Sequence, residues 1–273
     1  MSKDINLYEL KNISYTYPNN IIALDDISLR IKKNSVFAII GANGCGKSTL
    51  MYILNGLIFP NKGEIIYNGE KLSEEKFRDK EFVEKFRSTN ALVFQDPDVQ
   101  LFCSDVFSEL SFSLIQLKLF FEKEIIERVN QTAELLNITD LLNRSVSALS
   151  GGEKKKVAIA SVLTLNPDVI LLDEPTSDLD PKAQGLMVEI LLELHNIGKS
   201  IIITTHDLGL IDDLKPQLCV MNEQHKIETI GKAEEILENE ELLMKVNLIH
   251  KHSHIHDGST HKHIHSHYKI HKH

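Results

Sequence analysis

Cysteine, long apolar runs and excess positive charge are all scarce in this sequence of 273 residues. Its three cysteines, Cys45, Cys103 and Cys219, are odd in number and widely spaced, which predicts reduced cytosolic thiols rather than disulfides or a metal site. No stretch approaches about eighteen uncharged apolar residues, so we expect no membrane-spanning helix. The net charge is −9 with histidine neutral, which argues against a partner nucleic acid held by phosphate neutralisation.

The two ends of the chain differ in composition. Residues 1–6 contain no apolar segment like that of a secretory signal peptide, so we expect the chain to stay in the cytosol. Ten of the 13 histidines follow residue 249. The chain therefore divides into a body, residues 1–247, and a His-rich tail, residues 248–273. An apolar content of 42% is enough for the body to bury a sizeable core.

A glycine-rich segment, residues 41–49, matches the phosphate-binding pattern G-x-x-x-x-G-K-[ST]. The apolar run 36–40 before it predicts a buried strand, and residues 48–54 after it can open a helix. Its backbone N–H groups would face phosphate oxygens, Lys47 would reach the β- and γ-phosphates, and Ser48 would ligate Mg²⁺. The alternative is a glycine-rich turn without a ligand, which would not need a strand, this glycine pattern and a helix in that order. The predicted nucleotide-binding residues here are Gly41, Asn43, Gly44, Cys45, Gly46, Lys47, Ser48 and Thr49.

The rest of the body alternates strand-like and helix-like segments. Residues 5–40 predict antiparallel strands and hairpins, residues 104–145 predict helices, and residues 232–246 predict one acidic helix. Short apolar, β-branched runs at 91–94, 169–172 and 200–204 alternate with helical segments at 151–165 and 182–196. This order predicts an α/β fold with a mostly parallel sheet that is covered on both faces.

Polar residues follow three of these predicted strands. Asp173 and Glu174 end the run 169–172, and we expect Asp173 to hold a water of the Mg²⁺ shell and Glu174 to polarise the attacking water. Gln95 follows the run 91–94 and can contact both Mg²⁺ and that water. His206 follows the run 200–204 and can hydrogen-bond the γ-phosphate. A single Gln or His is more often an ordinary loop residue, but the shared sheet edge favours a functional role for both.

The segment Leu149–Glu153 reads Leu-Ser-Gly-Gly-Glu and precedes a predicted helix. Ser150, Gly151 and Gly152 would offer free N–H groups and a hydroxyl to an anion. The alternative is an ordinary helix N-cap. Because one phosphate loop is already present, a second anion-binding helix start suggests a nucleotide held from its other side.

Taken in order, these motifs resemble the nucleotide-binding subunit of an ABC transporter over about residues 5–230. The resemblance implies an ABC ATPase domain at 1–247, in which a P-loop NTPase (RecA-like) core carries an antiparallel β subdomain and an α-helical subdomain at about 96–150. The implied cofactors are ATP and Mg²⁺, and the implied catalytic residues are Glu174, His206 and Lys47. It also implies a head-to-tail dimer, homodimeric or with a paralogous ATPase, in which Ser150 and Gly152 of one chain complete the ATP site of the other. Residues 177–180 would cross that interface.

Two positions add detail to this resemblance. Tyr17 occupies the place of the family's adenine-stacking aromatic residue, although Tyr15 is a nearby alternative. Glu153 replaces the more usual glutamine, a variation that leaves Ser150 and Gly152 intact and puts only its effect on turnover in doubt.

Residues 93–102 resemble the matching segment in the ATPases of energy-coupling factor importers, which take up vitamins, Co²⁺ or Ni²⁺. In that family the segment receives the coupling helices of a membrane partner. The resemblance implies transmembrane coupling and substrate-binding subunits as partners, and a peripheral location at the cytoplasmic face of the cell membrane.

The tail histidines are mostly spaced i, i+2, which suits Ni²⁺, Co²⁺ or Zn²⁺ binding along an extended chain. We expect the tail to be disordered without metal. A purification tag and an incidental solvated tail are the alternatives to one that buffers or senses a transported metal. The predicted metal ligands are Ser48, Gln95 and Asp173 for Mg²⁺, and His250, His252, His254, His256, His261, His263, His265 and His267 for the tail ion.

The sequence thus predicts an ATPase subunit that powers uptake of cobalt or nickel through a membrane partner. One alternative is the same ATPase serving a vitamin importer, with an incidental tail. A second is a soluble ABC protein that acts on ribosomes or DNA, although those proteins usually carry two cassettes or long insertions. A third is a metal store with a decayed cassette, against which the intact set of catalytic residues argues.

Overall fold

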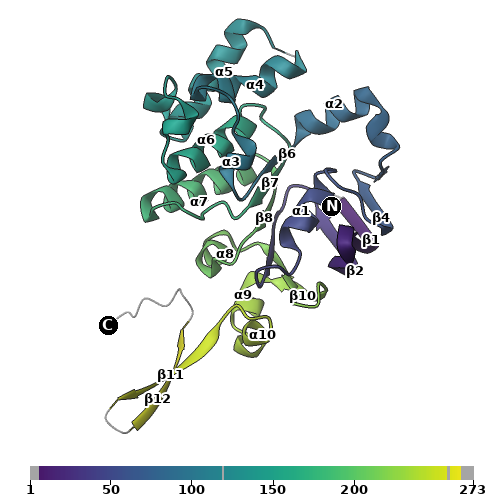
Figure 1. Cartoon of the computed structure of the whole chain (residues 1–273), viewed down its shortest axis with the longest axis vertical. Coiled ribbons are helices and arrows are strands. Elements are labelled where there is room, and N and C mark those ends of the chain that lie inside the picture. The colour runs from purple at the N-terminus through teal and green to yellow at the C-terminus, as the bar shows by residue number, and fades with distance from the viewer. Residues whose placement is uncertain (1–5, 119, 257–258, 266–273) are drawn as a thin grey trace.

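The computed structural model describes residues 6–118, 120–256 and 259–265, and gives the backbone alone for 250–256 and 259–265. Two sheets and a group of helices make up the body (Figure 1). The fold confirms the predicted α/β class, with a parallel core sheet and an antiparallel sheet beside it. Among the described residues, none of the helices has the length and apolar character needed to cross a bilayer.

The core sheet has six strands in the order β10-β9-β3-β8-β7-β6. Its strands are β3 (Val36–Gly41), β6 (Asn90–Val93), β7 (Val169–Asp173), β8 (Ser200–Thr204), β9 (Gln217–Met221) and β10 (Ile227–Lys232). All neighbours pair in parallel except β9 and β10, which are antiparallel. Strands β3, β6, β7 and β8 are buried at every residue because both faces of the sheet are covered.

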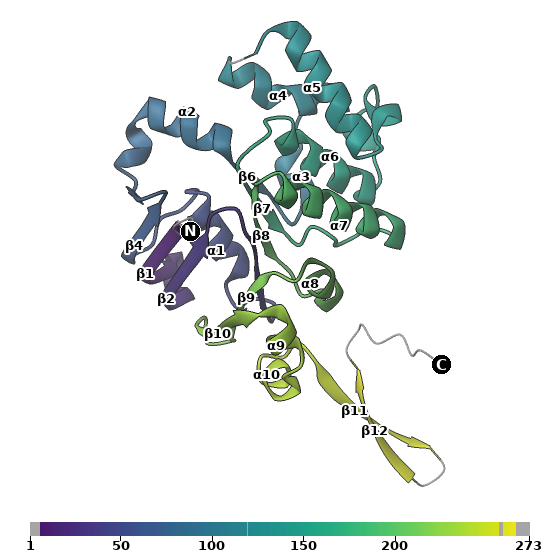
Figure 2. The ribbon, with the colours of Figure 1, turned by 180° about the vertical axis from the view of Figure 1, so that it is seen from behind.

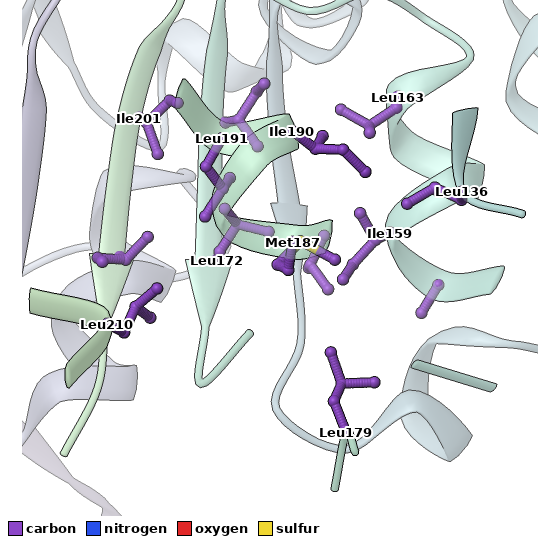
Figure 3. Close-up of a cluster of buried hydrophobic side chains, with 14 of the residues drawn as sticks. Leu136, Ile159, Leu163, Leu172, Leu179, Met187, Ile190, Leu191, Ile201 and Leu210 are labelled. Carbon is purple, nitrogen blue, oxygen red and sulfur yellow. The ribbon is translucent and has the colours of Figure 1, made fainter. Parts of the chain in front are cut away.

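Alternate residues of these strands enter two separate cores. Ile170, Leu172 and Ile201 point to one face, whereas Leu171 and Ile202 belong to the cluster on the other. Figure 3 shows the first cluster, where Leu172 and Ile201 lie near Met187, Ile190 and Leu191 of α7 (Pro181–Asn196). The second cluster also contains buried residues of α1 (Lys47–Leu54) and of the antiparallel sheet.

The antiparallel sheet has the order β2-β1-β4-β5 and lies beside α1 in both views (Figures 1 and 2). Its strands are β1 (Asn6–Tyr17), β2 (Ile21–Lys32), β4 (Lys62–Tyr67) and β5 (Glu70–Leu72). The chain then passes through α2 (Lys80–Thr89) into β6. This sheet brings Tyr17, at the end of β1, within hydrogen-bond distance of α1, where its hydroxyl lies 3.2 Å from Thr49 Oγ1.

The helices between β6 and β7 form a lobe at the opposite side of the core sheet from the antiparallel sheet (Figures 1 and 2). They are α3 (Pro97–Gln100), α4 (Val106–Leu117), α5 (Glu122–Leu135) and α6 (Gly151–Leu163), with 3₁₀ turns at Thr139–Leu141 and Val146–Ala148. After β8 comes α8 (Leu208–Leu214).

The C-terminal part differs from the sequence prediction in two respects. The single acidic helix expected at 232–246 is two helices, α9 (Ala233–Leu237) and α10 (Glu240–Lys245), because Asn239 starts a new one by accepting a hydrogen bond from Leu242 N. The tail, expected to be disordered, contains an antiparallel hairpin of β11 (His250–His256) and β12 (Ser259–His265). Histidines alternate with other residues along both segments, which matches the two-residue period of a β-strand and makes this pairing possible.

Candidate ATP site

The glycine-rich segment connects β3 to α1, as its sequence predicts. Gly46 caps α1 with φ of 110°, and a Cβ there would lie 2.2 Å from Ala23 O, so only glycine fits. Lys47 is buried and its Nζ donates to Gly41 O at 2.8 Å and Ala42 O at 3.2 Å. These contacts fix the shape of the loop. The ammonium group of Lys47 and the first N–H groups of α1 therefore lie close together, as phosphate binding requires.

A cleft of about 420 Å³ opens over this loop. It brings together ten of the predicted site residues, namely Tyr17, Asn43, Gly44, Gly46, Lys47, Ser48, Thr49, Gln95, Asp173 and Glu174. Tyr17 lines the cleft. The ring of Tyr15 contacts the ring of Tyr17 edge-on, with 4.8 Å between the ring centroids, and Tyr15 packs against the second core cluster. The structure therefore favours Tyr17 over Tyr15 as the aromatic residue that faces a ligand.

A second cavity of about 770 Å³ adjoins the first, and Asn43 and Glu174 border both. Gly41, Ser177, Asp178, His206 and Asp207 line it. Glu174 thus stands between the phosphate loop and the residues that the sequence places at a dimer interface.

Glu174 is buried and held in a fixed position. Its φ of 50° lies in the left-handed region, which non-glycine residues rarely adopt. One carboxylate oxygen lies 2.9 Å from His206 Nδ1, and the other accepts a hydrogen bond of 3.2 Å from Thr205 Oγ1. A carboxylate that is fixed by two partners and lines both cavities is well placed to orient a water molecule.

Asp173 has the features of a ligand to a cation or to its hydration shell. Its Oδ1 accepts a hydrogen bond from Thr204 Oγ1, whereas its Oδ2 is buried and has no hydrogen-bond partner among the described residues. A buried carboxylate oxygen without a partner is costly unless a cation or water satisfies it. Because Ser48 and Gln95 line the same cleft, these three residues fit a hydrated Mg²⁺ ion.

The predicted anion-binding residues at the start of α6 lie elsewhere. Ser150 is the N-cap, and its backbone N and its Oγ both donate to Glu153 Oε2 at 2.8 Å. These hydrogen bonds hold the pKa of Glu153 below its usual range. Neither cavity is lined by Ser150, Gly151 or Gly152, so one chain does not bring them to the phosphate loop.

Three polar residues that line the cleft or hold its neighbouring segments were not predicted from the sequence. His225 lines the cleft, with its Nδ1 3.3 Å from Cys45 O. Gln100 joins the segment after β6 to α6. Lys155 lies buried in α6, and burial lowers the pKa of its ammonium against the opposing pull of Asp173, Asp178 and Glu174. No local pattern announces these roles, which depend on contacts between distant segments.

The remaining predicted residues have different outcomes. Cys45 is buried beneath the loop, and burial raises the pKa of its thiol, so it stays neutral. The side chains of the tail histidines from His250 to His265 lie outside what the structure describes, and His267 lies outside it altogether. Among the described residues, no group of three or more His, Cys, Asp or Glu side chains could hold a metal ion.

Comparison with protein families matches residues 24–177 to the ABC transporter domain. An ABC transporter ATP-binding protein of Methanosarcina acetivorans is 46% identical over 236 residues, which is 85% of this chain and 85% of that protein. The energy-coupling factor transporter ATP-binding protein EcfA of Carboxydothermus hydrogenoformans is 40% identical over 214 residues, 78% of this chain and 77% of that protein.

Solved structures agree. The cbiO1 protein of Clostridium perfringens, described as part of the ABC transporter complex cbiONQ, superposes with a TM-score of 0.74 at 35% identity, covering 90% of this chain and 96% of that one. The dimeric cassette MJ0796 bound to ADP and Pi superposes with a TM-score of 0.75 at 27% identity, covering 83% and 98%. Together with the cleft over the phosphate loop, these matches show that the chain belongs to the ABC transporter family as an ATP-binding and ATP-hydrolysing subunit.

Proposed function

We propose that this subunit energises the import of a divalent cation, cobalt or nickel, through a membrane partner. The observation that carries the proposal is a cassette similar to cbiO1 and EcfA followed by a tail that holds ten of the 13 histidines. Imidazole is a preferred ligand of such cations. A metal-binding tail on an energy-coupling cassette would concentrate the ion near the site of its transport.

The cleft supplies the parts that ATP hydrolysis needs. Tyr17 stacks on the adenine, and the loop N–H groups with Lys47 hold the phosphates. Ser48 and Gln95, with Asp173 through a water, would hold Mg²⁺, and the ion would supply positive charge to neutralise the phosphates. Glu174 orients and polarises the attacking water, and His206 positions the γ-phosphate.

The second half of each site comes from another chain. Ser150 and Gly151 are exposed and face neither cavity, while Ser177 and Asp178 line the open cavity next to Glu174. A head-to-tail dimer would bring Ser150 and Gly152 of one chain to the phosphates bound by the other. The dimeric structure of the similar cassette MJ0796 supports the pairing of two such chains. Two copies of this chain, or this chain and a paralogue, can form it.

The surface between β6 and α4 is the expected contact for the transmembrane coupling subunit. Val99 is 69% exposed and Phe102 is 66% exposed, and the Phe102 ring lies against Phe112 at 4.7 Å between centroids. Exposed apolar side chains grouped in this way mark an interaction surface. They would keep the subunit at the cytoplasmic face of the membrane together with the coupling and substrate-binding subunits.

The backbone of the tail supports metal binding. In the β11–β12 hairpin, three histidine pairs stand opposite each other, His250 with His265, His252 with His263, and His254 with His261. Residues two apart share one face of a strand, so these positions lie on a single face of the hairpin. Ni²⁺, Co²⁺ and Zn²⁺ are the ions that such a set of imidazoles would select, and the choice among them depends on supply and geometry.

A vitamin importer is the second candidate, because relatives named EcfA belong to energy-coupling factor transporters. In that case the tail would be incidental. A soluble ABC ATPase that acts away from membranes is the third candidate, and it predicts that the chain does not copurify with membrane proteins.

Uptake assays separate the candidates. Cells that carry the chain with its membrane partners are tested for uptake of Ni²⁺, Co²⁺ and vitamins. They are compared with cells whose chain ends at residue 249, and with a full-length control whose ten tail histidines are serines. We expect ATP-dependent uptake of Ni²⁺ or Co²⁺ that weakens at low metal concentration in both variants. Uptake of a vitamin alone, equal in all three, would reject the cation proposal.

A further inference from the structure

Lys155 is a buried charge on α6, with an exposed fraction of 1%. A buried ammonium group is costly unless its three N–H donors find acceptors. Lys155 Nζ donates to Gln95 O at 2.8 Å, to Phe94 O at 3.4 Å and to Asp173 O at 3.4 Å. All three acceptors are backbone carbonyls, so the Lys155 side chain is bonded to the main chain at the end of β6 and at the end of β7.

These carbonyls lie at the catalytic edge of the sheet. Phe94 and Gln95 directly follow β6, and Asp173 ends β7 just before Glu174. The two strands are parallel neighbours, with Val93 opposite Leu172. One side chain therefore ties α6 to both strand ends that carry the residues proposed to meet Mg²⁺ and the attacking water.

A second contact ties α6 to the same region but does not replace the first. Gln100 Oε1 accepts a hydrogen bond from Phe94 N at 3.1 Å, and its Nε2 donates to Ala158 O at 2.7 Å. Gln100 thus connects α6 to the segment after β6 alone. Lys155 also reaches the end of β7, so it sets the position of α6 relative to both strands.

The other end of this connection is the Leu-Ser-Gly-Gly-Glu segment. Lys155 lies five residues after Ser150 on the same helix, about 7.5 Å along its axis. A shift of α6 against the sheet would move Ser150 together with the carbonyls of Gln95 and Asp173.

We propose that Lys155 is a positioning residue for ATP hydrolysis, which keeps the catalytic edge of its own chain in register with the Ser150 segment of α6. Lys155 acts through its hydrogen bonds to the backbone carbonyls of Gln95 and Asp173, and it contacts no nucleotide itself. The effect on a partner chain rests on the head-to-tail dimer proposed above, whereas the effect on the chain's own catalytic edge does not. Neither depends on which substrate is transported.

Three variants of the full chain test this role. Lys155→Met removes the donors at similar volume, Lys155→Gln keeps N–H donors without the charge, and Lys156→Met is the control at a partly exposed neighbour on the same helix. We expect Lys155→Met to lower kcat for ATP about tenfold or more, since a misplacement of roughly 1 Å can cost about a hundredfold. KM for ATP should change less than about threefold, because the phosphate loop is intact.

Lys155→Gln should recover part of the lost kcat, and Lys156→Met should stay within about twofold of the unchanged chain. Adding Lys155→Met to Glu174→Gln should reduce the ATP-dependent dimer seen by size-exclusion chromatography; absence of that dimer in Glu174→Gln alone would count against the dimer and not against Lys155. An unchanged kcat in Lys155→Met, or a matching loss of ATP binding, would overturn the proposal. Equal loss of folding in the Met and Gln variants, measured by thermal melting, would reduce Lys155 to a structural residue and also overturn it.

Discussion

Two helices of this protein begin at glycine-containing segments, and their surroundings differ. The start of α1 is enclosed by its own chain, where Lys47 and Thr49 are buried and Asp173 and Glu174 line the same cleft. The start of α6 is exposed, and the side chain of Glu153 occupies its Ser150 donors. Each helix start can bind an anion. Only the start of α1 is surrounded by other site residues of its own chain, and in the proposed dimer the start of α6 would meet the nucleotide bound by the partner chain.

The difference also separates binding from turnover. In the proposed dimer, a nucleotide would bind at α1 with the residues of one chain, whereas hydrolysis would also need the start of α6 from the other chain. Variants that damage one helix start and spare the other therefore show which step depends on which helix start.

The largest effect is expected for Glu174→Gln, which leaves both helix starts intact. Loss of a general base costs typically about 10²–10⁴-fold in rate, so ATP hydrolysis should nearly stop while ATP still binds. The nucleotide should then hold the dimer together, as a stable ATP-dependent species in size-exclusion chromatography. Hydrolysis at the unaltered rate would remove Glu174 from its catalytic role.

Lys47→Ala damages the enclosed half alone. Removing a single group that stabilises developing charge costs about 10²–10³-fold, and the loss should affect nucleotide binding as well as turnover. A fluorescent ATP analogue and an ATPase assay measure the two effects, with Lys156→Ala as the control. Unchanged binding and activity would mean that the loop at Gly41 is not the phosphate site.

The smallest effect concerns the exposed half. Glu153→Gln keeps a side chain that can accept from Ser150 but removes a negative charge from the helix start, where charge effects amount to about 0.3–1 kcal/mol. We expect ATP turnover to rise about two- to fivefold, because the phosphates would meet less repulsion. The steady-state kcat/KM of the two proteins measures this, and a fall in turnover would show that Glu153 helps the site as it stands.

Much of the enclosed half was readable from the sequence. Asp173 and Glu174 directly follow an apolar run, and the parallel order of β6, β7 and β8 brings them to the edge that also holds Gln95 and His206. The phosphate loop carries its own local pattern. In such cases the functional residue directly follows the strand in the chain, so the apolar pattern of the strand is enough to place that residue at the edge of the sheet.

Other features could not be read in this way. Lys155 reads as one of three consecutive lysines in a charged helix, and only the contact with Gln95, 60 residues away, shows that it is buried. His225 follows β9 and lines the cleft because it lies near Cys45, which is distant in the chain, and no local pattern shows this. The pairing of β11 with β12 needs the register between two histidine-rich segments, which their composition does not fix.

In the proposed dimer each ATP site is completed by a second chain, and mixing two inactive variants tests this arrangement. Ser150→Arg and Glu174→Gln should each be inactive alone, since every site of either homodimer is defective. In a mixed dimer one site combines an intact Glu174 with an intact Ser150, so the mixture should recover about a quarter of the unaltered ATPase rate or more. A mixture no more active than its two components would show that the ATP sites are not shared between two chains.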